Sequence, residues 1–170
     1  DGSGANYDPA DTFPMPGSAV TLFAQWTLDT YTITYNLDSG TNDPGNPASY
    51  TVLTPTITLQ PATKAGYTFG GWYADAGFTT PVTQIVLGST GNVTLYAKFT
   101  AVYPVTYNGN GSTGGSAPVD ALSPYAAGAT VTVLGAGSLV RTGYTFVDWD
   151  MASDGSGANY DPADTFPMPG

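Results

Sequence analysis

Histidine, cysteine and glutamate are missing from this 170-residue chain, whose acidic residues are all aspartate. Without imidazole and thiol groups there is no Ser-His or Cys-His nucleophile, no histidine base near neutral pH, and no zinc or iron site of the usual ligand types. Paired aspartates could still serve a glycosidase, but the chain offers no domain large enough to hold a substrate cleft. We therefore expect a protein that is not an enzyme.

Positive charge is also scarce. Lys64, Lys98 and Arg141 stand against 13 acidic residues, and the net charge is -10. Three scattered bases cannot neutralise a run of phosphates, and an anionic membrane surface repels an acidic chain. No segment reaches the roughly 18 apolar residues of a membrane-spanning helix. The sequence thus predicts neither a nucleic-acid partner nor insertion into a membrane.

The residues that are abundant favour β-structure. Hydrophobic residues make up 41% of the chain and charged residues 9%, which indicates a folded chain rather than a disordered one. Threonine, tyrosine, valine and glycine, the residues of strands and turns, are common, while most strong helix formers are scarce. This composition is also typical of secreted bacterial surface proteins. We expect a mainly β protein that is extracellular and located at the cell surface.

A stretch of seventeen residues, DGSGANYDPADTFPMPG, occurs twice without one change, at 1–17 and at 154–170. Because the copies begin at residues 1 and 154, the period is 153 residues. Three weaker matches lie inside this period: AGYTFGGWY at 65–73 with TGYTFVDWD at 142–150, VTLFAQWT at 20–27 with VTLYAKFT at 93–100, and YTITYN at 31–36 with YPVTYN at 103–108. The sequence therefore predicts tandem modules of two related kinds.

These repeats divide the chain into three parts. We expect residues 1–27 to be the C-terminal part of a preceding A module, 28–100 a complete B module, and 101–170 an A module that lacks its last strand. A copy of 18–27 placed after Gly170 would supply that strand, so the chain fits an alternating array of A and B modules. The sequence passes directly from a last strand to a first one at FTAVYPV (99–105), which predicts a short and fairly stiff joint.

Alternating apolar residues predict the strands of the B module. One predicted strand places four of them on a common face: Tyr31, Ile33, Tyr35 and Leu37. The last strand does the same with Leu95, Ala97 and Phe99. A short helix is possible only at 116–128, where Pro124 limits it to about two turns.

The matched segments resemble a known family, the Listeria-Bacteroides repeat, or internalin B-repeat, of bacterial surface proteins. Its modules carry a first strand Y-x-[IV]-T-[YF], a central GYTF-x-GW and a closing VTLYA-x-[WF]. The B module has all three, at 31–35, 66–72 and 93–99. The A module has Val147 and Asp148 in place of the two glycines before its tryptophan, and a long insertion at 150–170, so its loops are expected to differ.

The resemblance implies tandem, small β-grasp-like modules, each a mixed sheet with its helix shortened or absent. The family has no known catalytic residues, so none are carried over. The implied function is a structural tandem-repeat segment of an extracellular bacterial fibre or adhesin stalk, whose partners are neighbouring copies of the same repeat, head to tail. The alternative is a binding module for a glycan, a host protein or calcium.

Two aromatic clusters permit a sharper hypothesis, a platform on which a sugar ring stacks. They consist of Tyr67, Phe69 and Trp72 in the B module and Tyr144, Phe146 and Trp149 in the A module. The simpler interpretation is that Phe69, Trp72 and their counterparts fill the cores, because small domains need large side chains to bury enough surface. We expect the core role.

Aspartates crowd the end of the A module, and carboxylates are the ligands that calcium prefers. The calcium candidates are Asp148, Asp150, Asp154, Asp161 and Asp164. Their spacing fits no EF-hand loop, so the simpler interpretation is a solvated acidic loop in which aspartates form turns. No cofactor is expected. Tyr160, Phe166 and Met168 in the same segment should pack onto a sheet or onto the next module.

The two lysines raise one more hypothesis, an internal Lys-Asn isopeptide bond of the kind found in some surface adhesins. Such a bond needs a carboxylic acid beside it in an apolar pocket. Lys98 alternates with core residues and so points away from the core, and Gln25 stands at the equivalent position of the A module. The sequence therefore disfavours an isopeptide bond at Lys64 or Lys98.

The last expectation concerns residues 18–27. Without a closing strand, the core-facing side of YPVTYN would be uncovered and its backbone groups unpaired, a cost that a small sheet cannot bear. The matching segment carries Val20, Leu22, Ala24 and Trp26 on one face. We expect Val20–Trp26 to complete the 101–170 module of another copy, parallel to Tyr103–Asn108 as the resemblance implies, and not the 28–100 module.

Overall fold

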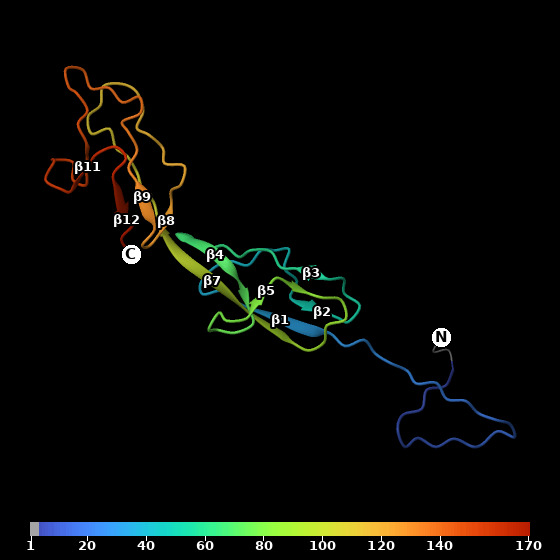
Figure 1. Cartoon of the computed structure of the whole chain (residues 1–170). Helices are drawn as coiled ribbons and strands as arrows, with labels where there is room; N and C mark the ends of the chain where they lie inside the picture. The colour runs from blue at the N-terminus through green and yellow to red at the C-terminus, as the bar shows by residue number, and fades with distance from the viewer. Residues whose placement is uncertain (1–3) are drawn as a thin grey trace.

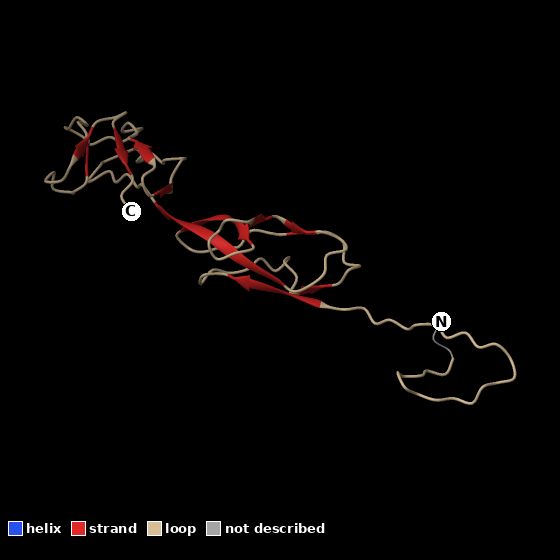
Figure 2. Cartoon of the chain, turned by 60° about the horizontal axis from the view of Figure 1, so that its bottom comes forward, coloured by secondary structure: helices blue, strands red, loops and turns tan. Residues whose placement is uncertain are grey.

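The computed structural model describes residues 4–170, and within them the chain forms twelve strands and no helix (Figures 1 and 2). The expected mainly β class is confirmed. The described residues accordingly hold no helix long and apolar enough to cross a membrane. Residues 1–3 of the predicted 1–27 part lie outside the described residues.

The B module is built on a sheet in which β7 occupies a central position. Its strands are β1 (Tyr31–Asn36), β2 (Ser49–Tyr50), β3 (Ile57–Thr58), β4 (Tyr67–Tyr73), β5 (Pro81–Val82), β6 (Gln84–Ile85) and β7 (Val93–Tyr103). The order in the main sheet is β2-β1-β7-β4-β5, and β3 pairs with β6 separately. β1 and β7 run parallel, with Ile33 opposite Val93, while β4 and β7 are antiparallel. The parallel pairing that the resemblance implies is therefore present.

The core of the B module lies on the faces that the alternation predicts. Leu95 of β7 is completely buried, and the cluster around it consists of Ile33, Tyr50, Ala62, Trp72, Ile85 and Ala97. The remaining residues of the two predicted faces pack against this cluster: Tyr31, Tyr35, Leu37 and Phe99. The faces assigned from the sequence are thus confirmed.

Trp72 is anchored by a bulge in β4. The register shifts between Phe69 and Gly71, and Gly71 has a φ of 117°, which an L side chain rarely adopts. The bulge turns the following Trp72 into the core, where its indole N–H donates to the carbonyl of Gln60 at 2.8 Å. In the A module Asp148 stands at the position of Gly71 and has no positive φ.

The joint between the modules is a strand. β7 spans eleven residues, of which Val93–Ala101 pair within the B module and Val102–Tyr103 pair with β8 (Tyr125–Ala126) of the A module. Figure 1 shows β7 running from one module into the next. The short joint predicted at 99–105 is therefore a shared strand.

The A module contains smaller sheets. Its strands after β8 are β9 (Thr130–Thr132), β10 (Trp149–Asp150), β11 (Asn159–Tyr160) and β12 (Thr165–Pro167). β9 pairs with β12, and β10 pairs with β11, both antiparallel. Tyr125, Val131 and Met168 form the buried core, with Phe166 packed against it. The 150–170 insertion therefore packs onto the module, as its apolar residues predicted.

The short helix considered for residues 116–128 is absent, and that possibility is wrong. The segment contains a turn at 121–122 followed by β8. The carboxylate of Asp120 explains the difference, because it accepts hydrogen bonds from the amide of Leu122 at 2.9 Å and from the hydroxyl of Tyr125 at 2.6 Å. A side chain that binds nearby groups in this way competes with the hydrogen bonds of a helix.

We expect the Tyr125–Asp120 hydrogen bond to stabilise the A module at neutral pH and to lose this effect at alkaline pH. This bond, together with burial and the charge of the carboxylate, raises the pKa of Tyr125 from 10.0 to about 12. The stabilisation is present below pH 10 and disappears as the pH rises to about 12, because the unfolded state releases the proton first. In thermal melts, wild type should exceed Tyr125→Phe in stability at pH 8, and the difference should vanish near pH 12. A difference that persists there would contradict this role.

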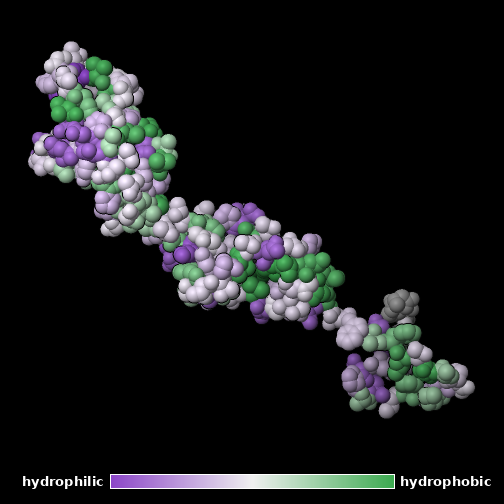
Figure 3. Space-filling view, viewed as in Figure 1, coloured by the Kyte–Doolittle hydropathy of each residue, from purple (hydrophilic) through white to green (hydrophobic). Residues whose placement is uncertain are grey.

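Residues 4–30 precede β1 and contain no strand. Leu22 is 64% exposed and Trp26 is 90% exposed, and Figure 3 shows hydrophobic surface over this segment. Val20–Trp26 does not pair with the B module, as expected. In the single chain the segment is unpaired, and its pairing with another copy stays a prediction.

Candidate functional site

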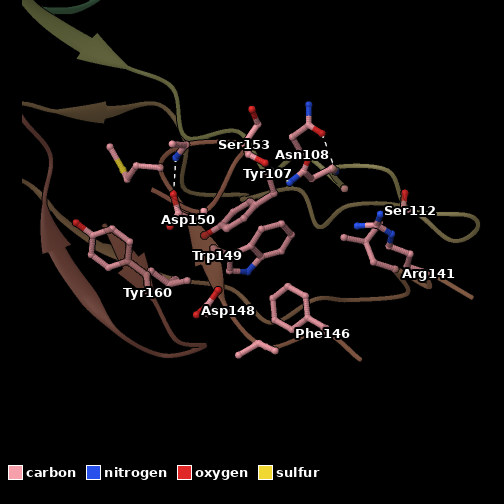
Figure 4. Close-up of a pocket in the computed structure, with 18 of the residues that line it drawn as sticks. Tyr107, Asn108, Ser112, Arg141, Phe146, Asp148, Trp149, Asp150, Ser153 and Tyr160 are labelled. Carbon is pink, nitrogen blue, oxygen red and sulfur yellow. Dashed lines mark hydrogen bonds between the residues drawn. The ribbon is translucent and has the colours of Figure 1, made fainter. Parts of the chain in front are cut away.

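A groove of about 870 Å³ opens in the A module. One wall is formed by residues 105–108, which follow β7, and the other by residues 144–150, which lead into β10. Figure 4 shows Tyr107 and Trp149 close together within it and Phe146 beside Trp149. The ring centroids of Tyr107 and Trp149 are 4.8 Å apart, and those of Phe146 and Trp149 are 5.0 Å apart. We refer to this feature as the A-module groove.

The B module has a strand in the corresponding place. By the sequence match, Tyr35 and Trp72 are the counterparts of Tyr107 and Trp149, and their rings are 5.2 Å apart. β7 lies between the strands that carry Tyr35 and Trp72 and fills the space with Leu95. The A-module groove therefore lies where the sequence predicts the missing last strand.

The aromatic residues proposed as a sugar platform have different environments in the two modules. In the B module, Trp72 is buried and Phe69 is half-buried against it, with 5.4 Å between their ring centroids. In the A module, Trp149 is only half-buried and Tyr144 is 67% exposed. The core role holds for the B module, while the A module leaves its aromatic rings accessible in the groove.

Four of the five aspartates considered for calcium accept hydrogen bonds from neighbouring groups, and Asp161 takes part through its backbone. Asp150 accepts hydrogen bonds from the amides of Ala152 and Gly157, and Asp148 accepts one from the side chain of Asn159. Hydrogen bonds from Ser156 lower the pKa of Asp154. The carboxylate of Asp164 accepts from the amide of Asp161 at 2.9 Å. Across residues 4–170 no three side chains of metal-binding type come together.

These contacts lead to a prediction about calcium. Millimolar calcium should change the melting temperature by no more than about a degree, because a ligand stabilises a fold only in proportion to its binding to the native state. Differential scanning calorimetry with calcium and with a chelator measures this directly. A clear rise with calcium that Asp150→Asn abolishes would overturn the prediction and establish a site.

The two lysines have partners other than an asparagine. The Nζ atom of Lys64 lies 2.8 Å from Oδ2 of the exposed Asp38 and 4.3 Å from the ring centroid of Tyr67. Lys98 lies over the ring of Tyr73 at 5.6 Å, on the face away from the core. Neither arrangement is the apolar pocket that an isopeptide bond requires.

Sequence reasoning missed two polar features of the groove. Arg141 lies over the ring of Tyr144 at 4.1 Å, which the equivalence with Lys64 and Tyr67 could have indicated. The Oδ2 atom of Asp150 is buried without a hydrogen-bond partner among the described residues. No sequence signal marks this atom, because its burial depends on how the insertion folds.

Two small β modules joined through one strand define the chain as a tandem-repeat β protein. The family model of the Listeria-Bacteroides repeat domain matches residues 31–98 and again residues 103–169. The chain belongs to this family, and the resemblance found from its motifs is confirmed. Each match corresponds to one module.

The chain is similar to several bacterial proteins. It is 35% identical over 153 residues to a protein of Evansella cellulosilytica named "Putative membrane protein", a match that covers 86% of this chain and 22% of that protein. It is 38% identical over 100 residues to Internalin H of Listeria monocytogenes, which covers 57% of this chain and 17% of that protein. The chain therefore spans less than a quarter of either relative. No solved structure matches it.

Proposed function

We propose that the chain is a structural segment of an extracellular bacterial fibre or adhesin stalk, in which tandem modules hold other parts of the protein away from the cell surface. The observation that carries this proposal is the shared strand β7, which ends the B module and begins the A module without a linker. Eleven residues in one strand extend roughly 35 Å. A joint of this kind favours extension over folding back of one module on the next.

Relatives and composition support the same role. The matched regions make up 22% of the Evansella cellulosilytica protein and 17% of Internalin H, which suits a repeat segment within a larger surface protein. The absence of histidine and cysteine argues against most catalytic roles. An acidic surface with a net charge of -10 also favours solubility at the cell surface.

The alternative is a binding module for a glycan, a host protein or calcium. The accessible rings of Tyr107 and Trp149 in the A-module groove favour this alternative, because aromatic rings stack on sugars. A glycan module would bind an oligosaccharide whatever the number of repeats. A spacer would change in length with every added repeat and bind none.

Small-angle X-ray scattering on chains with one, two and three 153-residue periods tests the spacer role. The maximum dimension should rise by the same increment with each period. Replacing Ala101 and Val102 by glycine should weaken the shared strand and reduce the increment, because glycine in a strand costs conformational entropy. Compact particles whose dimension does not grow in equal steps would reject the spacer function.

A further inference from the structure

We infer that the A-module groove is an acceptor for a β-strand, and that the strand it takes is residues 20–26 of a second copy of this chain. The strand lies parallel to Tyr103–Asn108 and antiparallel to Tyr144–Asp150, in the position that β7 has in the B module. This inference goes beyond the spacer role, because it states which strand completes the A module, whether the second copy continues the same chain or belongs to another chain.

The B module shows what fills such a groove. β7 lies between β1 and β4, and opposite Tyr35 it places Leu95, the most deeply buried side chain of that module. The A module has Tyr107 and Trp149 in equivalent positions, but none of its residues stands in the position of Leu95. Residues 101–170 therefore do not themselves supply the apolar strand that fills this place in the B module.

Residues 20–27 have the sequence that fits this place. They are identical to residues 93–100 at five of eight positions. The other three keep the character of the side chain: Phe23 and Trp26 are aromatic like Tyr96 and Phe99, and Gln25 is long and polar like Lys98. In its own chain the segment has no strand partner and leaves its leucine in solvent. An unpaired segment whose sequence is similar to residues 93–100 of β7 is thus available to the groove.

Backbone groups of the wall that follows β7 are free to pair. In the B module the amide of Ile33 donates to the carbonyl of Ala48, the residue before β2, at 2.8 Å. Ile33 thus directs its backbone groups toward β2, and the residues on either side of it in β1 direct theirs toward β7. The A module repeats this arrangement, because the amide of Val105 donates to Oγ of Ser123 at 3.0 Å. Among residues 4–170 the amides of Thr106 and Asn108 donate to no protein group.

The register follows from the B module. Ile33 lies opposite Val93 there, and Phe69 lies opposite Phe99. The sequence match translates these pairs into Val20 opposite Val105 and Trp26 opposite Phe146. Leu22 then enters the groove at Tyr107, as Leu95 does at Tyr35.

Arg141 supplies a further contact for the incoming strand. In the B module the Nζ atom of Lys64 lies 5.6 Å from the ring centroid of Phe99. Arg141 has the equivalent position and already lies over Tyr144 at 4.1 Å. Trp26 takes the place of Phe99, and tryptophan is the ring that binds a cation most strongly.

Hydrogen exchange on the full-length Leu22→Asp chain, which keeps the groove and loses its own donor, tests the inference. Saturation with a synthetic peptide of residues 18–27 should slow exchange of the Thr106 and Asn108 amides at least about tenfold, because they become hydrogen-bonded in a sheet. A peptide with the Leu22→Asp change should have no effect. A peptide with Gln25→Lys, which matches Lys98 of β7, should protect as well as the parent.

Association of the full chain provides the second measurement. Wild type and Gln25→Lys should form head-to-tail oligomers as the concentration rises, while Leu22→Asp stays monomeric in sedimentation experiments. The inference is overturned if the peptide leaves Thr106 and Asn108 unprotected, if Leu22→Asp associates as strongly as wild type, or if an oligosaccharide protects these amides and the peptide does not. None of these outcomes depends on how the length of a covalent array grows, so a failed spacer function is recognised separately.

Discussion

Replacing Trp72 by alanine is expected to unfold the B module. The side chain is 3% exposed, its rings contact Tyr35 and Phe69, and its indole N–H donates to the carbonyl of Gln60. Truncating a buried aromatic costs about 3–5 kcal/mol, which is comparable to the whole stability of so small a domain. Calorimetry should show the loss of one unfolding transition.

Trp26→Ala is the matched control, because it removes the same kind of side chain from the same chain. Trp26 lies in solvent, so its removal should leave the melting of the B module unchanged. A Trp72→Ala chain that melts within a few degrees of the parent would contradict the core assignment, and it would favour the sugar platform.

Leu95→Ala should destabilise the B module by about 2–5 kcal/mol, the usual range for deleting a fully buried leucine. Leu22 is the equivalent residue of the repeat, and its exposed side chain predicts a change within about 0.5 kcal/mol for Leu22→Ala in the monomer. Denaturant unfolding of both variants at low protein concentration measures the difference. Equal losses would show that the repeat match assigns the strands wrongly.

The two copies of the seventeen-residue repeat show which structure depends on local sequence and which depends on neighbouring strands. In both copies the same turn forms. The amide of Asp11 donates to the carbonyl of Asp8 at 3.0 Å, and the amide of Asp164 donates to the carbonyl of Asp161 at 3.0 Å. Strand pairing differs, because only the second copy has β9 beside it. Turns follow from the sequence alone, whereas strands require a neighbour.

The methionines of the two copies show the same dependence on context. Met15 is 72% exposed, while Met168, with the same neighbours in sequence, is 6% exposed.

The lengths of β4 and β10 differ for a related reason, the presence or absence of a neighbouring strand. Tyr67–Tyr73 of the B module form a seven-residue strand that pairs with β7, whereas in the matching segment of the A module only the last two residues, Trp149 and Asp150, are a strand.

The candidate site was predictable in position but not in detail. The missing last strand of the 101–170 part could be inferred from the repeats, and with it the uncovered side of YPVTYN. The Asp120–Tyr125 hydrogen bond and the buried Oδ2 of Asp150 were not predictable, because they depend on the paths of loops whose lengths and sequences differ from those of the B module. The missing helix at 116–128 has the same cause.

The alternating array requires that A and B modules share one arrangement of strands, and a chain with two consecutive 153-residue periods tests this most directly. Gly170 lies beside Ala127, next to the end of β7, so a strand attached there can run parallel to Tyr103–Asn108. The measurement is the backbone hydrogen bonds of the inner copy of residues 18–27, obtained from a crystal structure or by NMR.

We expect the inner copy of Val20–Trp26 to pair in parallel with Tyr103–Asn108 and antiparallel with Tyr144–Asp150 of the module before it. Its leucine and tryptophan should be buried there, as Leu95 and Phe99 pack within the B module. An inner copy that stays in solvent, or that pairs with the B module following it, would contradict the alternating array.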